Sequence, residues 1–163
     1  MDTASRLYLG APAAPDLLRS AATTLAYEPG QMCLISLSPT ASVNTLQPVE
    51  VAHVNAAVHA RLQRVLACAR GLPADAFSRA VCRTRRALRL PVHDPRVLRL
   101  WLPKPYWPYV EELAVSSVMA AAIVRQRRVL GAVLLWRQAG MVPFDAIDQE
   151  YVAALARRLA VGL

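Results

Sequence analysis

Cysteines are the first side chains in this sequence that could do chemistry, because thiolates attack electrophiles and bind soft metals. The three are scattered along the chain, at Cys33, Cys68 and Cys82. A disulfide framework would need an even set, and a zinc site would need paired spacing such as Cys-x-x-Cys. We therefore expect three free thiols, buried or half-buried, and no metal site.

Histidines are the next candidates, since general acid–base catalysis uses a histidine paired with a carboxylate or a nucleophile. They stand at His53, His59 and His93. His93 is followed directly by Asp94, but the side chains of consecutive residues in an extended chain point apart. We expect polar surface or loop histidines. With no supported catalytic constellation, the protein is predicted not to be an enzyme.

Aromatic side chains are concentrated between Val92 and Glu112, a stretch that also contains four prolines. They are Trp101, Tyr106, Trp107 and Tyr109. Such a stretch is typical of an ordered loop with at most short helices. Aromatic residues bury large areas, so these four could line a small-molecule pocket or could cover the sheet and close the core.

Arginine supplies almost all of the formal net charge of +8, and Lys104 is the only lysine. The densest group in the sequence is formed by Arg79, Arg83, Arg85, Arg86 and Arg89, followed by Arg96 and Arg99. A basic surface can attract nucleic acid or another anionic partner. A solvated face of an arginine-rich chain gives the same pattern, so both interpretations stay open.

Length and composition favour one globular domain, because 163 residues with 55% apolar content can bury a real core. The longest apolar run, Val115 to Val124, is far shorter than the roughly 20 residues that a membrane helix needs. Residues Met1 to Arg6 lack the basic start and apolar stretch of a signal peptide. We expect a cytoplasmic protein without membrane contact, with an N-terminal arm over residues 1–14 and one domain over residues 15–163.

Hydrophobic spacing predicts the elements of the first half of the chain. A helix should begin at Pro15-Asp16 and end before a turn at Pro29-Gly30. Two antiparallel strands are predicted over residues 32–37 and 49–54. Helices over residues 56–69 and 76–86 should follow, the second capped by Asp75, and then a short strand over residues 87–91.

The second half ends in a hairpin and a helix. The β-rich runs over residues 116–124 and 129–136 flank Arg125-Gln126-Arg127-Arg128, which predicts a hairpin with a charged, exposed tip. The last helix should begin at Asp145, with Asp148 also in a position to satisfy free N–H groups. Its inward stripe is predicted to contain Ile147, Val152, Leu155, Ala156 and Leu159.

These C-terminal residues resemble the GAF family. Ser117 opens the first hairpin strand, Gly131 lies in the second, and Pro143-Phe144-Asp145 starts the last helix, as in GAF domains. Gly131 suits a close backbone approach or a bulge, and Phe144 suits a hydrophobic staple ahead of the helix. The resemblance covers roughly residues 16–161 and is strongest over residues 115–159.

The resemblance implies an α+β fold, with a GAF-like central antiparallel sheet, helices packed on one face and a loop-covered pocket on the other. It places the aromatic stretch over that pocket, with two serines at its floor. The ligand-binding residues that it implies are Trp101, Tyr106, Trp107, Tyr109, Ser116 and Ser117. It also implies a homodimer through the terminal helices and a signalling protein as partner.

The sequence departs from three specialised branches of the family. Arg137-Gln138 and Gln149 stand where cyclic-nucleotide-binding relatives have Asn-Lys and Glu, and no cysteine has the neighbouring histidine of bilin-binding relatives. Methionine sulfoxide reductases of GAF fold carry an attacking cysteine in the loop that lies here between Val92 and Val115, and this loop has none. The sequence therefore identifies no cofactor and no particular ligand.

Together these patterns predict a non-catalytic small-molecule sensor or regulatory module in intracellular signalling. The alternative is a ligand-free adaptor that binds a protein or a nucleic acid through its arginine-rich surface. A site closed by Trp101 and Trp107 without a cavity would favour the adaptor. An open pocket with Tyr106 or Tyr109 turned inward would favour the sensor.

Overall fold

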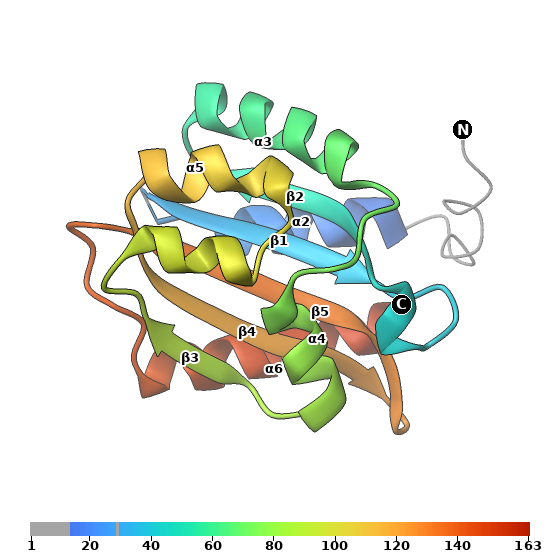
Figure 1. The fold of residues 1–163 in the computed structure, drawn as a ribbon. Helices are drawn as coiled ribbons and strands as arrows, with labels where there is room; N and C mark the ends of the chain where they lie inside the picture. Colours follow the sequence, from blue (N-terminus) through green and yellow to red (C-terminus); the bar gives the residue numbers. More distant parts are fainter. Residues whose placement is uncertain (1–13, 29) are drawn as a thin grey trace.

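A five-stranded antiparallel sheet forms the centre of the molecule (Figure 1). The structure, a computed structural model, describes residues 14–28 and 30–163. In sheet order the strands are β2 (Gln47–His53), β1 (Gln31–Leu37), β5 (Arg128–Gln138), β4 (Val115–Arg125) and β3 (Leu88–Pro91). The predicted α+β class with a central antiparallel sheet is confirmed.

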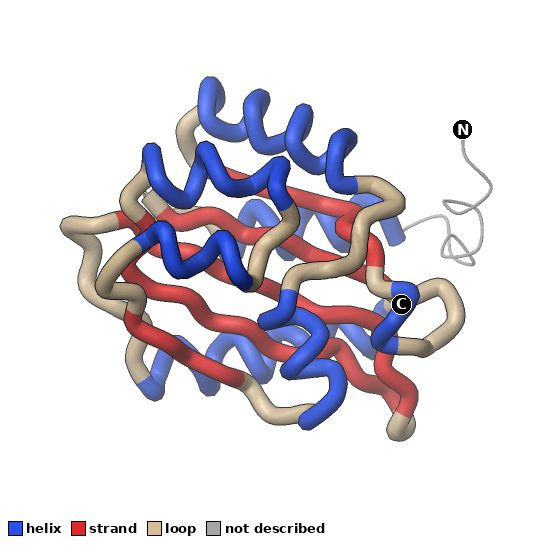
Figure 2. The backbone as a smooth tube through the Cα atoms, in the orientation of Figure 1, coloured by secondary structure: helices blue, strands red, loops and turns tan. Residues whose placement is uncertain are grey.

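Helices cover both faces of this sheet. On the back face in Figure 1 lie α2 (Ala14–Leu25) and α6 (Ala146–Gly162), and on the front face lie α3 (Ala56–Ala69), α4 (Ala76–Thr84) and α5 (Trp107–Glu112). The 3-10 helices η2 (Pro95–Leu100) and η3 (Lys104–Tyr106) belong to the front layer, which Figure 2 shows interrupted by loops. A third, η1 (Val43–Thr45), lies between β1 and β2.

The predicted N-terminal arm lies outside the described residues except for Ala14, which begins α2. Pro29, half of the predicted turn after this helix, also lies outside them. The stretch expected to be a loop with at most short helices contains η2, η3 and the six-residue helix α5, as predicted.

Two hydrophobic cores, one on each face, result from the alternation of side chains along the strands. In β5, Leu134 and Trp136 belong to the front core, whereas Val133 and Leu135 belong to the back core. All seven residues of β1 are buried, because this strand is sandwiched between the two layers. The residues predicted to bind ligand are divided between these faces: Tyr106 and Tyr109 belong to the front core, whereas Ser117 contacts Phe144 of the back core.

Side-chain caps fix where the longer helices begin. Asn55 Oδ1 accepts hydrogen bonds from the backbone N–H groups of Ala57 and Val58 at the start of α3. Asp145 opens α6 in a capping box, in which its side chain and that of Asp148 each accept the other's backbone N–H. The predicted start of the last helix is thus confirmed.

The predicted inward stripe of α6 is wrong at its first member. Ile147 is 76% exposed, whereas Val152, Ala156 and Leu159 are buried as expected. Ile147 precedes Val152 by five residues, which places it about 140° away around the helix at 3.6 residues per turn. The capping box fixes this rotation, so Ile147 faces solvent.

None of the helices within residues 14–28 and 30–163 combines the length and apolar character that crossing a bilayer requires. The longest, α6, has 17 residues. It also carries the exposed charges of Arg157 and Arg158, and a membrane helix needs about 20 predominantly apolar residues.

Gly131 allows the close packing of β5 against β1. A Cβ at this position would overlap the backbone carbonyl oxygen of Ser36 and lie 2.9 Å from Leu37 Cδ2. The pairing with β4 also shifts register beside it, between Ile123 and Val124. The close approach and the bulge expected from the sequence are both present.

We expect Gly131→Ala to lower the free energy of unfolding by about 3 kcal/mol, the upper end of the usual cost of overpacking. The obstacle is backbone, which cannot rotate away as a side chain can. Urea unfolding followed by circular dichroism measures the loss. Gly71→Ala is the control, because Gly71 has φ +80° but no atom near the added Cβ, and it should cost about 1 kcal/mol. Equal losses in the two variants would contradict the steric explanation.

Candidate functional site

The candidate site lies on the front face, where the aromatic stretch meets the sheet. Tyr106, at the end of η3, is buried and packs edge-on against Trp136 in β5, with 5.7 Å between the ring centroids at an angle of 89°. Pairs of this geometry are favourable because the positive edge of one ring meets the negative face of the other. Tyr106 thus occupies the space directly over the sheet.

Two hydrogen-bond donors in this pair have no partner. Within the described structure, Tyr106 Oη and Trp136 Nε1 are both buried and neither is hydrogen-bonded. An unsatisfied buried polar group costs roughly 1–3 kcal/mol, and buried tyrosine and tryptophan usually find an acceptor. Two such donors at one place mark a position where an acceptor from outside the chain would be stabilised.

Asp75 lines the same small cavity as Tyr106 and is also buried. Its carboxylate caps α4 by accepting the backbone N–H of Ser78 at 2.7 Å. Burial raises the pKa of the Asp75 carboxyl above its ordinary value, and the bonds from Ser78 offset this only in part. The Ser78 hydroxyl lies near the carboxylate without a hydrogen bond of normal geometry.

The same environment disfavours the charged forms of its other titratable groups. Burial, followed by the nearby Asp75 carboxylate, raises the pKa of Tyr106 and raises the pKa of Cys82 to about 12. The Cys82 thiol donates to the carbonyl oxygen of Gly131 at 3.3 Å. A reactive cysteine needs the opposite shift, so Cys82 is held here as a neutral thiol.

The cavity enclosed at this place measures about 10 Å³. Its walls are Leu34, Ser36, Pro48, Ala69, Pro73, Asp75, Pro103 and Tyr106. This volume is near the lower limit for one water molecule, whereas pockets for drug-sized ligands measure roughly 300–1,000 Å³. The site is closed in this structure, with Tyr106 filling it.

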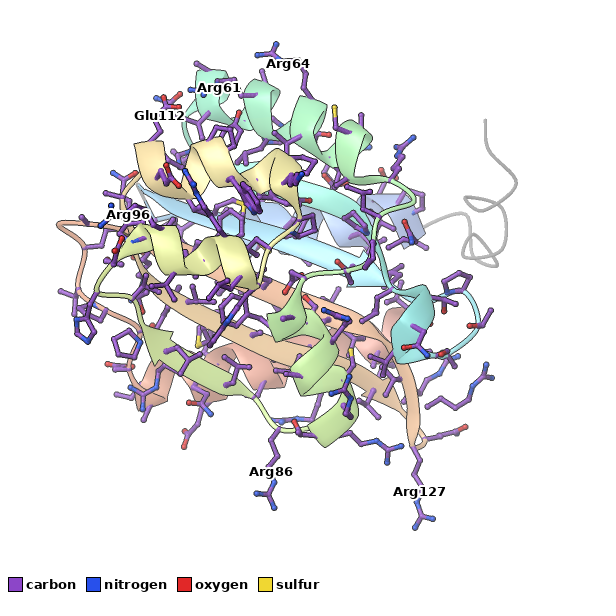
Figure 3. All side chains as sticks on the ribbon, in the orientation of Figure 1. Arg61, Arg64, Arg86, Arg96, Glu112 and Arg127 are labelled. Atoms are coloured by element: carbon purple, nitrogen blue, oxygen red, sulfur yellow. The ribbon has the colours of Figure 1, made fainter. Side chains whose placement is uncertain are left out.

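Residues 95–112, which we call the lid, cover the site and are tied to neighbouring elements by ion pairs. Arg61 in α3 binds Glu112 in α5 with both guanidinium nitrogens, at 2.7 and 2.6 Å, and its Cζ lies 4.8 Å from the centroid of the Tyr109 ring. Figure 3 shows Arg61 and Glu112 meeting at the outer edge of these helices. Within the lid, Arg99 also binds Glu111. These pairs are partly exposed, and exposed ion pairs contribute about 0–1 kcal/mol each.

The other three aromatic residues predicted to bind ligand lie in or beside the front core. Tyr109 is buried, and Trp107 is half-buried with its Nε1 donating to the carbonyl oxygen of Leu102 at 2.8 Å. Trp101 is 39% exposed and packs on Phe77 with ring centroids 4.9 Å apart. The structure thus brings together the four aromatic residues on one face.

The two serines predicted for the floor of the pocket do not join them. Ser117 is buried toward the back core, where its Oγ accepts the backbone N–H of Phe144 at 3.1 Å. Ser116 lies at a register shift in β4, and its Oγ donates to the carbonyl oxygen of Arg137 at 3.4 Å. Two further residues of the site were not predicted: Asp75, which was expected only as a helix cap, and Trp136.

A larger hollow of about 210 Å³ lies on the back face between α2 and α6, but its Arg137 and Asp148 already bind each other. Arg137 donates to Gln31 Oε1 at 2.8 Å, to Asp148 Oδ2 at 3.0 Å and to the carbonyl oxygen of Val142 at 3.0 Å. None of the interior polar atoms that lack a partner in the described chain lines this hollow. We therefore place the candidate site on the front face.

Removing the Tyr106 hydroxyl tests whether its donor is really unpaired. We expect Tyr106→Phe to raise the free energy of unfolding by about 1 kcal/mol, because an unsatisfied buried group is lost. Ser117→Ala should lower it by roughly 1–3 kcal/mol, because it leaves the buried Phe144 N–H without an acceptor. Urea unfolding of both variants measures the two signs. A loss of stability in Tyr106→Phe would mean that the hydroxyl has a partner.

The buried Asp75 should make stability depend on pH in the acidic range. Its pKa in the folded protein is raised above the unfolded value near 3.8, so the folded state binds this proton more tightly. The resulting stabilisation is complete below that value and is lost as the pH rises through the folded pKa. Relative to Asp75→Asn, the wild type should therefore lose stability on going from acid toward neutral pH. A difference between the two proteins that stays constant with pH would contradict this.

Comparisons with known proteins agree with this architecture. The GAF domain family model matches residues 13–163. The GAF domain/HD domain protein from Geobacter sulfurreducens is 17% identical with a TM-score of 0.64, over 91% of this chain and 91% of that chain. The GAF-B domain of DevS from Mycobacterium smegmatis is 21% identical with a TM-score of 0.58, over 91% and 90%.

An enzyme is also among the similar structures. The type II free methionine-R-sulfoxide reductase from Thermoplasma acidophilum is 10% identical with a TM-score of 0.59, over 99% of this chain and 94% of that chain. No curated protein matches the chain significantly. Identities this low show a shared fold and leave activity open.

The family assignment rests on nearly the whole chain rather than on a local motif. The matched residues include all five strands and both terminal helices of the described structure. Gly131 in β5 and Phe144-Asp145 before α6 also occupy the positions that the resemblance gave them. The chain belongs to the GAF domain family.

Proposed function

We propose that this GAF domain is a non-catalytic regulatory module that binds a small polar molecule between the sheet and the lid. GAF domains are in general regulatory modules that sense small molecules in signalling. The observation that carries the proposal here is the pair of buried donors, Tyr106 Oη and Trp136 Nε1, that lack acceptors among the described residues. A ligand that presents a carbonyl or similar neutral oxygen to them would remove an existing energetic cost.

Binding requires that the closed state be one of two accessible states. A ligand can shift such an equilibrium only by its difference in affinity for the two. The ion pairs that hold the lid are partly exposed and individually weak, so they allow Tyr106 to leave the space above Trp136. Lid displacement then becomes the change that reports occupancy.

The closed cavity taken alone is what a ligand-free adaptor would have. Two observations favour the sensor over it. The unpaired donors destabilise the closed state, and Tyr106 and Tyr109 both turn inward rather than serving as surface contacts. The raised pKa of Cys82, the thiol beside the site, supports a role without thiol catalysis.

Native mass spectrometry of the purified chain tests the proposal with two matched variants in α3. Ala69→Leu would fill the cavity, since Ala69 is part of its wall. Ala67→Leu makes the same change at an exposed position two residues away. We expect a small molecule that co-purifies with the wild type and with Ala67→Leu, is released on unfolding, and is missing from Ala69→Leu.

Two results would contradict the proposal. A molecule retained by Ala69→Leu, shown by circular dichroism to be folded, would lie elsewhere on the chain. A wild type that carries no molecule, and whose melting temperature does not rise in a mixture of cellular small molecules, would leave the adaptor as the better explanation.

A further inference from the structure

Six exposed arginines gather at one end of the molecule, and we call this group the arginine tip. It consists of Arg83, Arg85, Arg86, Arg125, Arg127 and Arg128. The first three lie at the C-terminal end of α4, and the others lie at the turn between β4 and β5. Arg85 Nη2 joins the two segments by donating to the carbonyl oxygen of Arg127 at 2.7 Å. Figure 3 shows Arg86 and Arg127 projecting outward from the same edge of the molecule.

The structure changes the composition of the basic group seen in the sequence. Arg89 does not belong to it, because its guanidinium donates to Phe144 O and to Gln149. Arg96 and Arg99 are paired with carboxylates in and beside the lid. In their place, folding brings the three arginines of the hairpin, distant in sequence, next to the end of α4.

The arginine tip lacks counter-charges. Across residues 14–28 and 30–163, none of its six guanidinium groups forms an ion pair, whereas Arg61, Arg99 and Arg137 all do. Like charges held together repel each other and destabilise the folded state. An anionic partner would remove this repulsion, so the tip is suited to bind a negatively charged surface.

The backbone at the tip would favour other residues. Arg85, Gln126 and Arg127 have φ angles of 57°, 48° and 69°, in the left-handed region that glycine and asparagine adopt most readily. The left-handed residue that ends an α-helix is commonly glycine, and the two residues of a tight hairpin turn are most often Asn-Gly. Arginine stands at two of these three positions, which places charge at the tip at a conformational cost.

We propose that the arginine tip binds the phosphodiester backbone of nucleic acid without reading its sequence. The planar guanidinium group of arginine can donate two parallel hydrogen bonds to one phosphate. Five of the six tip arginines are close neighbours: Arg85 and Arg86 are consecutive, as are Arg127 and Arg128, and Arg125 pairs with Arg128 across the turn. The helix end and the hairpin turn, joined by the bond from Arg85 to Arg127, present their charges side by side to such a backbone. No aromatic residue lies between residues 83 and 89 or between 125 and 130 to stack on bases.

A membrane surface is a poorer complement. None of the exposed large apolar side chains in the described structure comes from the tip, so nothing there would enter the interface of a bilayer. Phosphates spaced along a nucleic acid are therefore the better complement to a surface that offers charge alone.

The test uses the full chain and a fluorescein-labelled DNA duplex of mixed sequence, with binding followed by fluorescence anisotropy. The tip variant is Arg86→Gln with Arg127→Gln, and the control is Arg64→Gln in α3 with Arg70→Gln directly after it. All four arginines are exposed and their guanidinium groups make no hydrogen bond in the described structure, so each double variant loses two positive charges without losing a fold contact.

We expect the wild type and the control to bind, with log Kd depending linearly on log salt concentration. The tip variant should bind roughly tenfold more weakly, and its salt slope should be smaller by about 2, close to 0.9 for each lost phosphate contact. A duplex of scrambled sequence should bind equally well.

Three results would overturn the proposal. Equal weakening of the control would show that net charge, and not the tip, attracts the duplex. Binding to vesicles of phosphatidylcholine and phosphatidylserine, lost in the tip variant, with no binding to the duplex, would assign the tip to a membrane. If the wild type does not bind the duplex even at roughly 50 mM salt, nucleic acid is excluded as the partner of the tip.

Discussion

The apolar character of β1 and β5 on both faces is the constraint on which the rest of the structure depends. A strand whose every side chain is buried needs cover on two sides, so the sheet must be the middle of three layers. The back layer meets this requirement with α2 and α6. The front layer meets it with α3, α4 and the lid, because the chain between β3 and β4 must cross the sheet over Trp136.

This covering explains why the site is closed and also why two of its polar groups lack hydrogen-bond partners within the described residues. Tyr106 is the side chain that the lid places over Trp136, and it supplies apolar area and a favourable ring contact. Within residues 14–28 and 30–163, neither ring finds an acceptor for its polar hydrogen. The closed state therefore combines good packing with poor hydrogen bonding. A polar ligand would give up some of the packing of Tyr106 and gain hydrogen bonds to the two donors.

Much of the fold could be predicted because its signals are local. The caps at Asp75 and Asp145, the hairpin and the glycine in β5 all depend on a few neighbouring residues. It was harder to predict which face of the sheet or helix each side chain occupies, since this depends on where the periodic pattern of the element begins. Ser117 keeps the alternation of β4 and lies on the same side as Met119 and Ala121, so it turns to the back core. The prediction of a pocket floor did not fix which face of β4 meets the aromatic stretch, and helical periodicity alone failed in the same way at Ile147.

The candidate site was predicted only in part for a related reason. Aromatic residues concentrated in one stretch are visible in a sequence, and the four of them do meet on one face. Asp75 and Trp136 come from other elements, and only tertiary packing brings them beside Tyr106. The arginine tip shows the same effect, since its two halves are about 40 residues apart in the chain, as the bond between Arg85 and Arg127 with a separation of 42 shows.

Trp136 and Arg137 are consecutive residues of β5 that point to opposite faces of the sheet. The first supports the lid, and the second holds α6 through Asp148 and the Phe144 ring, 4.1 Å from its guanidinium carbon. One peptide unit therefore connects the two layers. A change in the position of this peptide unit would therefore alter the contacts of the lid on one face and of α6 on the other.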